Sequence, residues 1–358
     1  MTILFAAGGT GGHLYPAIAI AEEIRKRVPD VRIVFTGTKE KIEARVVPQH
    51  GYEFVTIWIS GFSRRLNINN LLFPLKVAVS LVQSFFVIRK LQPAVVIGTG
   101  GYVCGPMLFI ASLMRIPTVV HESNSYPGVT TRMLAPRATK VFIAFEATKR
   151  WLPSTAAIER VGNPTRDELS TVSREEGCAY FNLDPKKKTV FVFGGSLGAA
   201  SINAAMPKVI EEALKHDFQV IWQTGIQHVE TATKYSETEL IRIHPYIEHI
   251  EFAYAAADIV VSRAGATTLA ELTRLGKPAI LVPYPFAAAN HQELNAQTMK
   301  EAGAAIVVHD AELPQRLSSE VVSLLFDRRR QEEMRKYSLA LGKPDAAKEI
   351  VEKIFQLV

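Results

Sequence analysis

Short runs of apolar, largely β-branched residues alternate with longer amphipathic stretches along the whole chain. In the first half such runs lie at residues 32–36, 94–98, 118–121 and 140–144. The pattern starts again in the second half, with runs at residues 189–193, 219–223, 258–262 and 279–283. Alternation of this kind is typical of βαβ units and a parallel sheet. We therefore predict an α/β fold with two Rossmann-like, doubly wound domains.

A repeated strand-and-glycine pattern supports this division. Residues 3–12 read ILFAAGGTGG, and residues 190–199 echo them as VFVFGGSLGA. Between the repeats, the turn residues 162–164 (Gly-Asn-Pro) follow the last strand of the first half, so we expect an interdomain link to begin there. We predict an N-terminal domain over 1–163 and a C-terminal domain over 164–344, facing each other across a cleft. A helix at about 345–358 is expected to pack back on the first domain.

Charge is unevenly distributed between the two halves. The net charge is +6, yet residues 1–163 carry 19 Lys and Arg against 9 Asp and Glu (+10), and residues 164–358 carry 22 against 26 (−4). The asymmetry points to an anionic partner for the first half, either nucleic acid or a membrane surface, unless it serves solubility alone. Cys104 and Cys178 offer no disulfide framework, and no export signal is visible, so we expect a reducing, cytoplasmic compartment.

The most apolar stretch, residues 71–88, is the candidate for membrane contact. It holds Pro74, Lys76 and three polar residues, whereas a spanning helix needs about 20 cleaner positions. Its apolar side chains fall on nearly all faces of a helix, which is typical of a deeply buried or partly lipid-facing helix. Basic residues bracket it: Arg64, Arg65, Lys76, Arg89 and Lys90. Peripheral attachment to anionic lipid and a plain core helix are both compatible with this pattern.

Two glycine clusters in the first half indicate phosphate binding. Residues 8–13 (GGTGGH) lie between a predicted strand and a predicted helix, where backbone amides and a helix N-terminus face one spot. Leu14 stands where a dinucleotide fingerprint has its third glycine, and the chain contains no P-loop motif. A second cluster, residues 98–102 (GTGGY), also follows a strand. Two such loops in one domain suggest a pyrophosphate ligand.

Candidates for acid–base chemistry are few. His13 lies in the first loop, and His121 and Glu122 follow a strand at the edge where ligands bind in open α/β sheets. In the second half, residues 262–271 read as a strand end, a glycine turn and a new helix that Thr267 or Thr268 could cap. Glu271, one turn along, suits two ribose hydroxyls. The chain has no D-x-D pair and no clustered His or Cys spacing, so we predict no metal site.

Taken in order, these motifs resemble those of the bacterial peptidoglycan N-acetylglucosaminyltransferases of glycosyltransferase family 28. The resemblance covers essentially the full length, through GGTGGH, GTGGY, GNPTR, GGSLGA, RAGATTLAE and NHQ. It implies a GT-B arrangement and transfer of N-acetylglucosamine from UDP-N-acetylglucosamine to the C4 hydroxyl of MurNAc in undecaprenyl-pyrophosphoryl-MurNAc-pentapeptide, with inversion and without cofactor or metal. It also implies a peripheral position on the cytoplasmic face of the inner membrane, other cell-wall synthesis proteins as partners, and no nucleic acid.

The resemblance also assigns roles to residues. On the donor side it places the backbone of Ile247 at the uracil, Glu271 at the ribose and Gln292 at the sugar. It places three residues at the diphosphate: Ala266, Thr267 and Thr268. The other residues that it assigns to the donor are Thr10, Gly11, Gly12, Asn124, Arg166 and Ser196. Around the acceptor it places Gly9, His13, Gly100, Gly101, Tyr102, His121 and Glu122, with His13 the first choice as base. The chain departs from the family at Ser123, where the motif is often HEQN, and at Thr99, before a glycine pair.

Three other functions fit parts of this pattern. A diacylglycerol glycosyltransferase would share the donor domain, but the paired N-terminal glycine loops argue against a neutral lipid acceptor. A UDP-N-acetylglucosamine 2-epimerase has a similar architecture and needs no membrane-facing segment. A catalytically silent nucleotide-binding module would turn over neither substrate.

Overall fold

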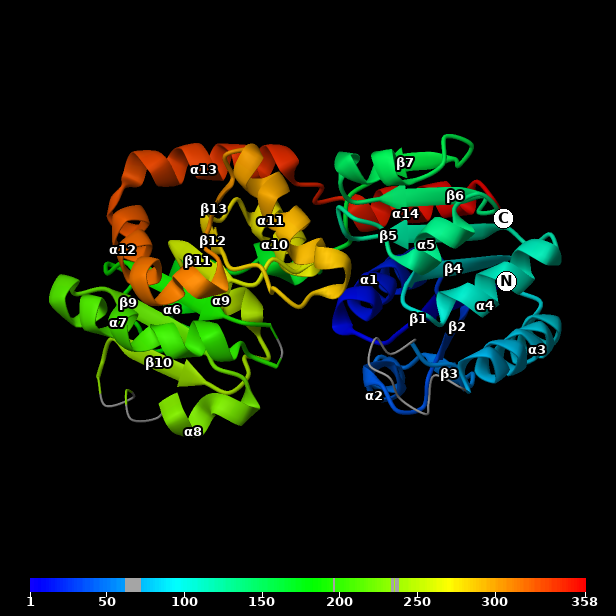
Figure 1. Cartoon of the computed structure of the whole chain (residues 1–358), viewed down its shortest axis with the longest axis horizontal. Coiled ribbons are helices and arrows are strands. Elements are labelled where there is room, and N and C mark those ends of the chain that lie inside the picture. Colours follow the sequence, from blue (N-terminus) through cyan, green and yellow to red (C-terminus); the bar gives the residue numbers. More distant parts are fainter. Residues whose placement is uncertain (62–71, 196, 233–234, 236–237) are drawn as a thin grey trace. The chain divides into compact units, whose positions relative to one another are not determined.

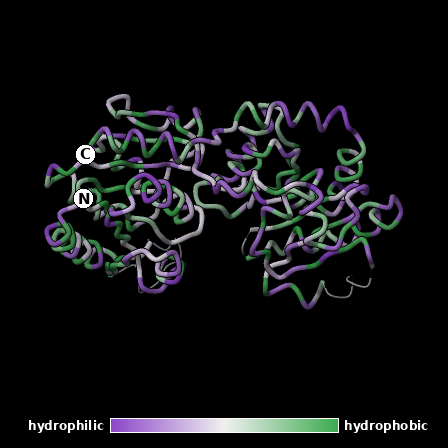
Figure 2. Tube along the Cα trace, turned by 180° about the vertical axis from the view of Figure 1, so that it is seen from behind, coloured by the Kyte–Doolittle hydropathy of each residue, from purple (hydrophilic) through white to green (hydrophobic). Residues whose placement is uncertain are grey.

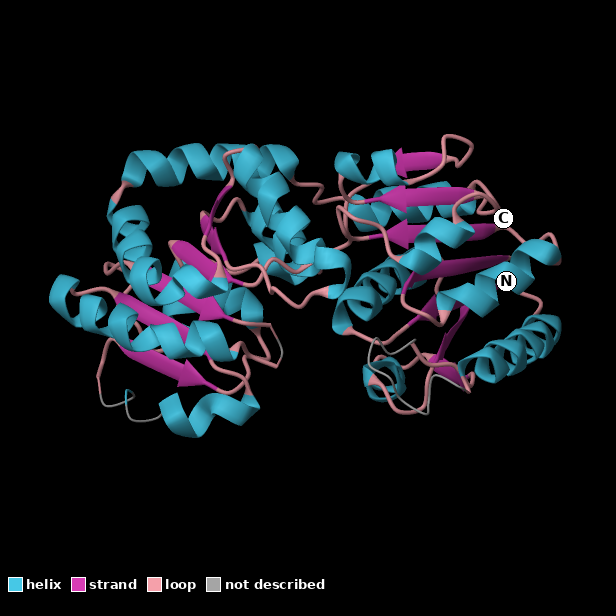
Figure 3. Ribbon diagram, viewed as in Figure 1, coloured by secondary structure: helices cyan, strands magenta, loops and turns pink. Residues whose placement is uncertain are grey.

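The computed structural model describes residues 1–61, 72–195, 197–232, 235 and 238–358. The chain forms two compact units, Met1–Thr165 with Lys343–Val358, and Arg166–Gly342 (Figure 1). Each described unit is built on one parallel sheet, with helices and strands mixed along the chain (Figure 3). The prediction of an α/β fold with two doubly wound, Rossmann-like domains is confirmed.

The sheet of the first unit has the strand order β3-β2-β1-β4-β5-β6-β7 among the described residues. Its strands are β1 (Thr2–Ala7), β2 (Arg32–Gly37), β3 (Glu53–Thr56), β4 (Val95–Gly100), β5 (Thr118–Glu122), β6 (Lys140–Ile143) and β7 (Ile158–Arg160). The intervening helices are α1 (Gly11–Arg27), α2 (Ile42–Gln49), α3 (Phe73–Leu91), α4 (Cys104–Leu113) and α5 (Val129–Leu134).

Helices cover both faces of this sheet. Ile3 and Phe5 of β1 pack in one cluster with residues of α1, α2 and the C-terminal helix α14 (Ala346–Phe355). Leu4 and Ala6 point the other way and pack with residues of α3, α4 and α5. Strands buried on both faces read as continuous apolar runs, which is the pattern seen in the sequence.

Helix α14 belongs to the first unit although the chain reaches it only after passing through the second. Ile350, Val351 and Ile354 join the same core cluster as α1. The Lys353 ammonium lies 2.6 Å from the Glu159 carboxylate, on the strand at the edge of the sheet.

The sheet of the second unit has the order β10-β9-β8-β11-β12-β13 among the described residues. Its strands are β8 (Thr189–Phe193), β9 (Gln219–Gln223), β10 (Ile241–His244), β11 (Ile259–Ser262), β12 (Ala279–Leu281) and β13 (Ala305–Val307). The helices are α6 (Arg174–Tyr180), α7 (Ala200–His216), α8 (Val229–Ala232), α9 (Ile250–Ala256), α10 (Ala266–Leu275), α11 (His291–Glu301), α12 (Leu313–Phe326) and α13 (Arg328–Leu341).

The hydropathy of the helices differs along the chain. Helix α13, which begins RRRQEEMRK, is drawn largely in the hydrophilic colour (Figure 2). Among the described residues, no helix has the length and apolarity needed to cross a membrane.

Candidate functional site

Both glycine loops of the first unit lie where the strand order reverses. From β1 the sheet grows outward through β2 and β3, and the chain then returns to the other side of β1 with β4. Ligands of open α/β sheets bind beyond the carboxyl ends of the strands at such a point. Strand β1 runs into residues 8–10 and β4 ends at Gly100. The strand order therefore brings the two predicted loops together.

Close backbone contacts explain two of the glycines. A Cβ atom on Gly101, whose φ is +85°, would lie 2.3 Å from the carbonyl oxygen of Gly8. One on Gly100, whose φ is +116°, would lie 2.2 Å from Nδ1 of His13. Both positions have a backbone conformation that favours glycine, and a larger residue at either one would displace the loop. The imidazole of His13 thus packs on the second loop at the start of α1.

Helix α1 begins with Thr10 as its N-cap, without a side-chain capping hydrogen bond. The amides of a first helical turn have no acceptor within the helix, so those of Gly11 and Gly12 suit an anion. One amide of the predicted site differs: Gly9 donates to Oε2 of Glu43 at 3.0 Å. The Gly9 amide is therefore engaged by the protein itself and does not face the predicted phosphate. Beside it lies the half-buried ring of Tyr102, and burial raises the pKa of this phenol.

His121 and Glu122 are engaged by their own chain. His121 is fully buried, its Nε2 lies 2.9 Å from the Gly162 carbonyl oxygen, and burial lowers its pKa. The Glu122 carboxylate accepts hydrogen bonds of 2.7–3.1 Å from backbone and side-chain donors of residues 124–131. These contacts tie the end of β5 to the start of α5 and to the turn at Gly162. They favour a structural role for both side chains over proton transfer.

Both cysteines are free and buried. The thiol of Cys104 donates to the Ala6 carbonyl oxygen at 2.9 Å, and burial raises its pKa to about 12. It therefore stays protonated and joins the start of α4 to the end of β1.

The second unit has its own reversal point, between β8 and β11. The loop after β8 packs backbone against backbone on the loop after β9. A Cβ atom on Gly198 would lie 2.0 Å from the Thr224 carbonyl oxygen, and one on Gly225 would lie 2.3 Å from that of Leu197. Ser196, a predicted donor contact in this loop, lies outside the described residues.

Gln223, at the end of β9, was not singled out from the sequence. Its buried side chain donates to the Gly195 carbonyl oxygen at 3.0 Å and accepts from the Ile247 amide at 2.8 Å. It thus joins the glycine loop to the buried residue that the family resemblance places at the uracil. In this structure the Ile247 amide is directed at Gln223.

Helix α10 begins at Ala266, directly after β11 and a glycine turn. Its N-cap is Gly265, and no side chain caps it, so the prediction of a cap by Thr267 or Thr268 is wrong. Both threonines lie in the first turn, next to amides that suit a phosphate. The buried hydroxyl of Thr267 makes no hydrogen bond with any residue that the structure describes.

Glu271 lies on the next turn of α10 and is 9% exposed. The hydroxyl of the fully buried Tyr254, on α9, donates to Oε2 of Glu271 at 2.8 Å. Burial raises the pKa of Glu271, and the Tyr254 hydrogen bond and the Arg166 charge oppose this rise. Arg166, exposed just after the turn that links the units, is therefore close enough to influence the carboxylate. A carboxylate oxygen can accept further hydrogen bonds from ligand hydroxyls.

Two more polar side chains complete this end of the second sheet. The guanidinium of Arg263, at the end of β11, donates to Ser201 Oγ at 2.8 Å and to the Val282 carbonyl oxygen at 3.2 Å, and it pairs with Asp310. Sequence reasoning missed this residue. Gln292, at the start of α11, accepts from the Tyr284 amide at 3.0 Å. No group of three His, Cys, Asp or Glu side chains in the described ranges is placed to hold a metal ion.

Comparison with known proteins gives a consistent result over the whole chain. Residues 3–143 match the glycosyltransferase family 28 N-terminal domain, and residues 189–350 match the glycosyltransferase family 28 C-terminal domain. Proteins named UDP-N-acetylglucosamine–N-acetylmuramyl-(pentapeptide) pyrophosphoryl-undecaprenol N-acetylglucosamine transferase are similar. The one from Flavobacterium psychrophilum is 42% identical, covering 99% of this chain and 97% of its own. The one from Chlorobaculum tepidum is 43% identical, covering 100% and 99%.

Solved structures agree with these matches. The crystal structure of Acinetobacter baumannii MurG has a TM-score of 0.79 and 26% identity, covering 99% of both chains. A Neisseria meningitidis UDP-GlcNAc 2-epimerase has a TM-score of 0.69 at 15% identity over 99% of this chain and 100% of its own, which shows a shared fold only.

Proposed function

Because the chain belongs to glycosyltransferase family 28, we propose that it transfers N-acetylglucosamine from UDP-N-acetylglucosamine to the C4 hydroxyl of the muramoyl sugar in undecaprenyl-pyrophosphoryl-MurNAc-pentapeptide. Relatives named for this transfer match the chain over nearly its full length. The observation that carries the proposal is the pair of reversal points, each with a glycine loop and a helix N-terminus. Such a point is suited to a pyrophosphate, and donor and acceptor each contain one.

The second unit is assigned the donor. The first turn of α10 offers amides and a positive helix end to the UDP diphosphate, next to Thr267 and Thr268. Glu271, held by Tyr254, accepts from the ribose hydroxyls. Ile247 lies at the uracil, and Gln292 lies at the sugar. Arg166 and Ser196 are proposed nucleotide contacts.

The first unit is assigned the acceptor. Gly100, Gly101 and Tyr102 contact the first glycine loop, and α1 directs its first-turn amides past the end of β1. Among the three acid–base candidates, His13 fits the role of base, because it lies at the junction of the two loops and is partly exposed. His121 and Glu122 instead hold the end of β5, from which Asn124 follows.

The proposed chemistry is a single displacement. His13 takes the proton from the acceptor C4 hydroxyl as its oxygen forms a bond to C1 of N-acetylglucosamine. The bond between C1 and the β-phosphate oxygen breaks, and the electron pair leaves with UDP. The N-terminus of α10 stabilises the negative charge that develops on the diphosphate. Attack opposite to the leaving group inverts C1.

Helix α3 supports a membrane-facing role for the first unit. Its buried side holds Ile88 and Leu91 together with the small, fully buried Ser80 and Ser84, whose hydroxyls donate to carbonyl groups of the same helix. Its outer side holds Leu75, Val82 and Phe86, which are 52%, 56% and 63% exposed. An ordinary surface helix exposes a polar face, whereas α3 exposes these large apolar side chains, and a contiguous exposed apolar face marks an interaction surface.

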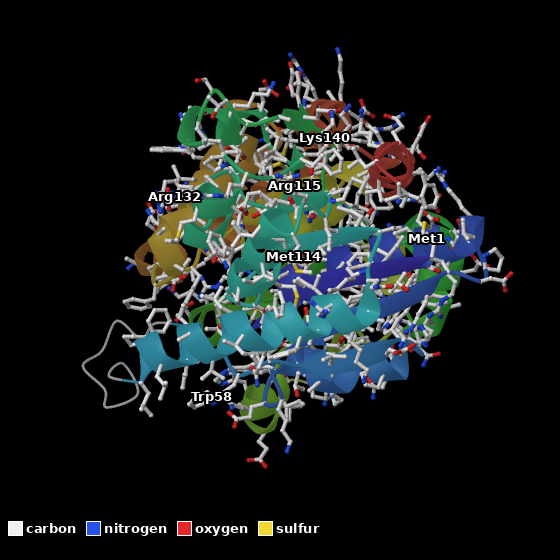
Figure 4. All side chains as sticks on the ribbon, turned by 90° about the vertical axis from the view of Figure 1, so that its right-hand side faces the viewer. Met1, Trp58, Met114, Arg115, Arg132 and Lys140 are labelled. Carbon is white, nitrogen blue, oxygen red and sulfur yellow. The ribbon has the colours of Figure 1, made fainter. Side chains whose placement is uncertain are left out.

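Basic and apolar side chains surround this face. Helix α3 ends in the exposed Arg89 and Lys90, and Leu113, at the end of the neighbouring helix α4, is 60% exposed. Figure 4 shows Trp58, Met114 and Arg115 on the side of the unit that α3 crosses. An apolar face with a basic rim suits an anionic bilayer surface, where each Lys or Arg contributes about 1 kcal/mol. Arg64 and Arg65, part of the predicted rim, lie outside the described residues. The acceptor is lipid-linked, so we place this face on the cytoplasmic side of the membrane.

The test uses the purified protein with UDP-N-acetylglucosamine, with and without the lipid-linked muramoyl acceptor. Release of UDP together with a disaccharide lipid, only when both substrates are present, is the expected result. Conversion of the donor alone would identify an epimerase and refute the proposal. Glycosylation of diacylglycerol in place of the muramoyl lipid would identify a different transferase, and turnover of no substrate would indicate a binding module.

A further inference from the structure

A buried carboxylate underlies the first glycine loop. Glu43, on the first turn of α2, is fully buried. Its Oε2 accepts from the Gly9 amide at 3.0 Å. Its Oε1 accepts from the amide of Thr38 at 3.0 Å and from the Thr38 hydroxyl at 2.8 Å. One side chain thus joins the segments that follow β1 and β2.

Two glycines leave room for this carboxylate. A Cβ atom on Gly8 would lie 2.5 Å from Oε1 of Glu43, and one on Gly37 would lie 2.5 Å from its Cγ. Both glycines have negative φ, so space rather than backbone conformation requires them. The ends of β1 and β2 are therefore shaped around Glu43.

Glu43 accepts hydrogen bonds at both oxygens of its carboxylate. Three donors converge on it, with Gly9 at one oxygen and Thr38 at the other. A buried carboxylate is costly unless such hydrogen bonds satisfy it. A glutamine has one acceptor oxygen and one amide group, so it would set a donor against a donor on one of the two sides.

We propose that Glu43 is a positioning residue for the acceptor. By holding the Gly9 amide, it fixes the turn from β1 into α1, and with it the direction of the first-turn amides and of His13. Thr38 also lies beside the Tyr102 hydroxyl, so the same cluster reaches the second glycine loop. This inference rests on the proposed function, because it assigns the acceptor to the first unit. Glu43 itself touches no substrate.

The test compares Glu43→Gln with a matched control, Thr36→Val. The control removes the buried hydroxyl that donates to the Phe5 carbonyl oxygen at 2.9 Å, on the same pair of strands but away from the loop. Thermal unfolding is measured for both, and steady-state kinetics are measured for each substrate. We expect kcat/KM for the lipid acceptor to fall roughly ten- to hundredfold in Glu43→Gln, as for a misplaced reacting group. We expect the donor KM to change less than the acceptor KM, because the second unit is assigned the nucleotide, and we expect Thr36→Val to keep both kinetic constants.

Gly8→Ala provides a second substitution, which keeps the Glu43 side chain itself. Its methyl group would press on Oε1 of Glu43, so the same selective loss for the acceptor is expected even if Glu43→Gln fails to fold. Equal losses for donor and acceptor, or acceptor kinetics unchanged in a folded Glu43→Gln, would overturn the inference. An inactive wild-type protein would instead refute the proposed function, so the two failures are distinguishable.

Discussion

Tyr254→Phe isolates the hydrogen bond that holds Glu271. The substitution removes the hydroxyl that donates to Oε2 at 2.8 Å and keeps the ring, which packs edge-on against Phe191 and Phe193. A hydrogen bond to a charged group contributes about 1.5–3 kcal/mol. For a unit of this size, that loss lowers the unfolding midpoint by roughly 3 to 12 °C. The variant should also raise the donor KM, because Glu271 loses its fixed orientation.

The pH dependence of this loss gives the sharper test. Burial raises the folded-state pKa of Glu271, so its contribution to stability is greatest below the unfolded pKa and declines as the pH rises through the folded pKa. The Tyr254 hydrogen bond lowers the pKa of Glu271, so its removal should raise that pKa further. The loss of stability with rising pH should therefore be larger in Tyr254→Phe than in wild type. At low pH the carboxyl is protonated, and only a neutral hydrogen bond of about 0.5–1.5 kcal/mol is lost.

Thermal unfolding of Tyr254→Phe and wild type at neutral pH and below pH 4.5, the ordinary glutamate value, measures this difference. The deficit should be larger at neutral pH. A deficit of equal size at both values, or none at either, would refute an ionised Glu271 held by Tyr254.

Three further outcomes are expected. Glu271→Ala should raise the donor KM by a factor that corresponds to about 1.5–3 kcal/mol of binding free energy for each lost charge-assisted bond. Glu301→Ala, which changes an exposed glutamate on α11, should leave the donor KM as it is, and unchanged donor kinetics in Glu271→Ala would show that Glu271 does not bind the ribose. Excess chelator should leave activity intact, because the sequence has no D-x-D pair, and a loss restored by magnesium would contradict this. Replacing Val82 and Phe86 by Ser, or Arg89 and Lys90 by Gln, should weaken binding to anionic vesicles at low salt but spare turnover of a short-chain acceptor. A control variant carries Leu214→Ser and Phe326→Ser, two similarly exposed apolar residues of the second unit, and should bind vesicles like wild type. Equal vesicle binding by all variants at low salt would argue against membrane contact through the α3 face.

The strands predicted from apolar runs are those inside the two sheets. The runs at 32–36, 94–98, 189–193 and 258–262 correspond to β2, β4, β8 and β11 within two residues at each end. The four strands that the pattern did not single out, β3, β7, β10 and β13, are the edges of the two sheets. Each is only three or four residues long, and three of them are partly exposed, so they carry a weak apolar signal.

Helix α3 shows the limit of periodicity. The sequence revealed an apolar segment with polar interruptions but left a buried helix and a lipid-facing helix equally open. The structure shows that Ser80 and Ser84 face the core while Val82 and Phe86 face outward. Which side of a nearly uniform helix is covered depends on its packing partner, here α4, and not on the helix itself.

By itself the sequence determined the fold class and the positions of the glycine loops, because local patterns encode strands, turns and helix starts. It also pointed to Glu271, since that residue follows its glycine turn within one helix. Only the tertiary structure decided which groups hold these loops: Glu43 meets Gly9 across 34 positions, and Gln223 meets Ile247 across 24. It also decided that His121 and Glu122 are engaged by backbone and side chains of their own chain. Such contacts form between segments that the strand order brings together, and the residue types alone do not specify which donors and acceptors will meet.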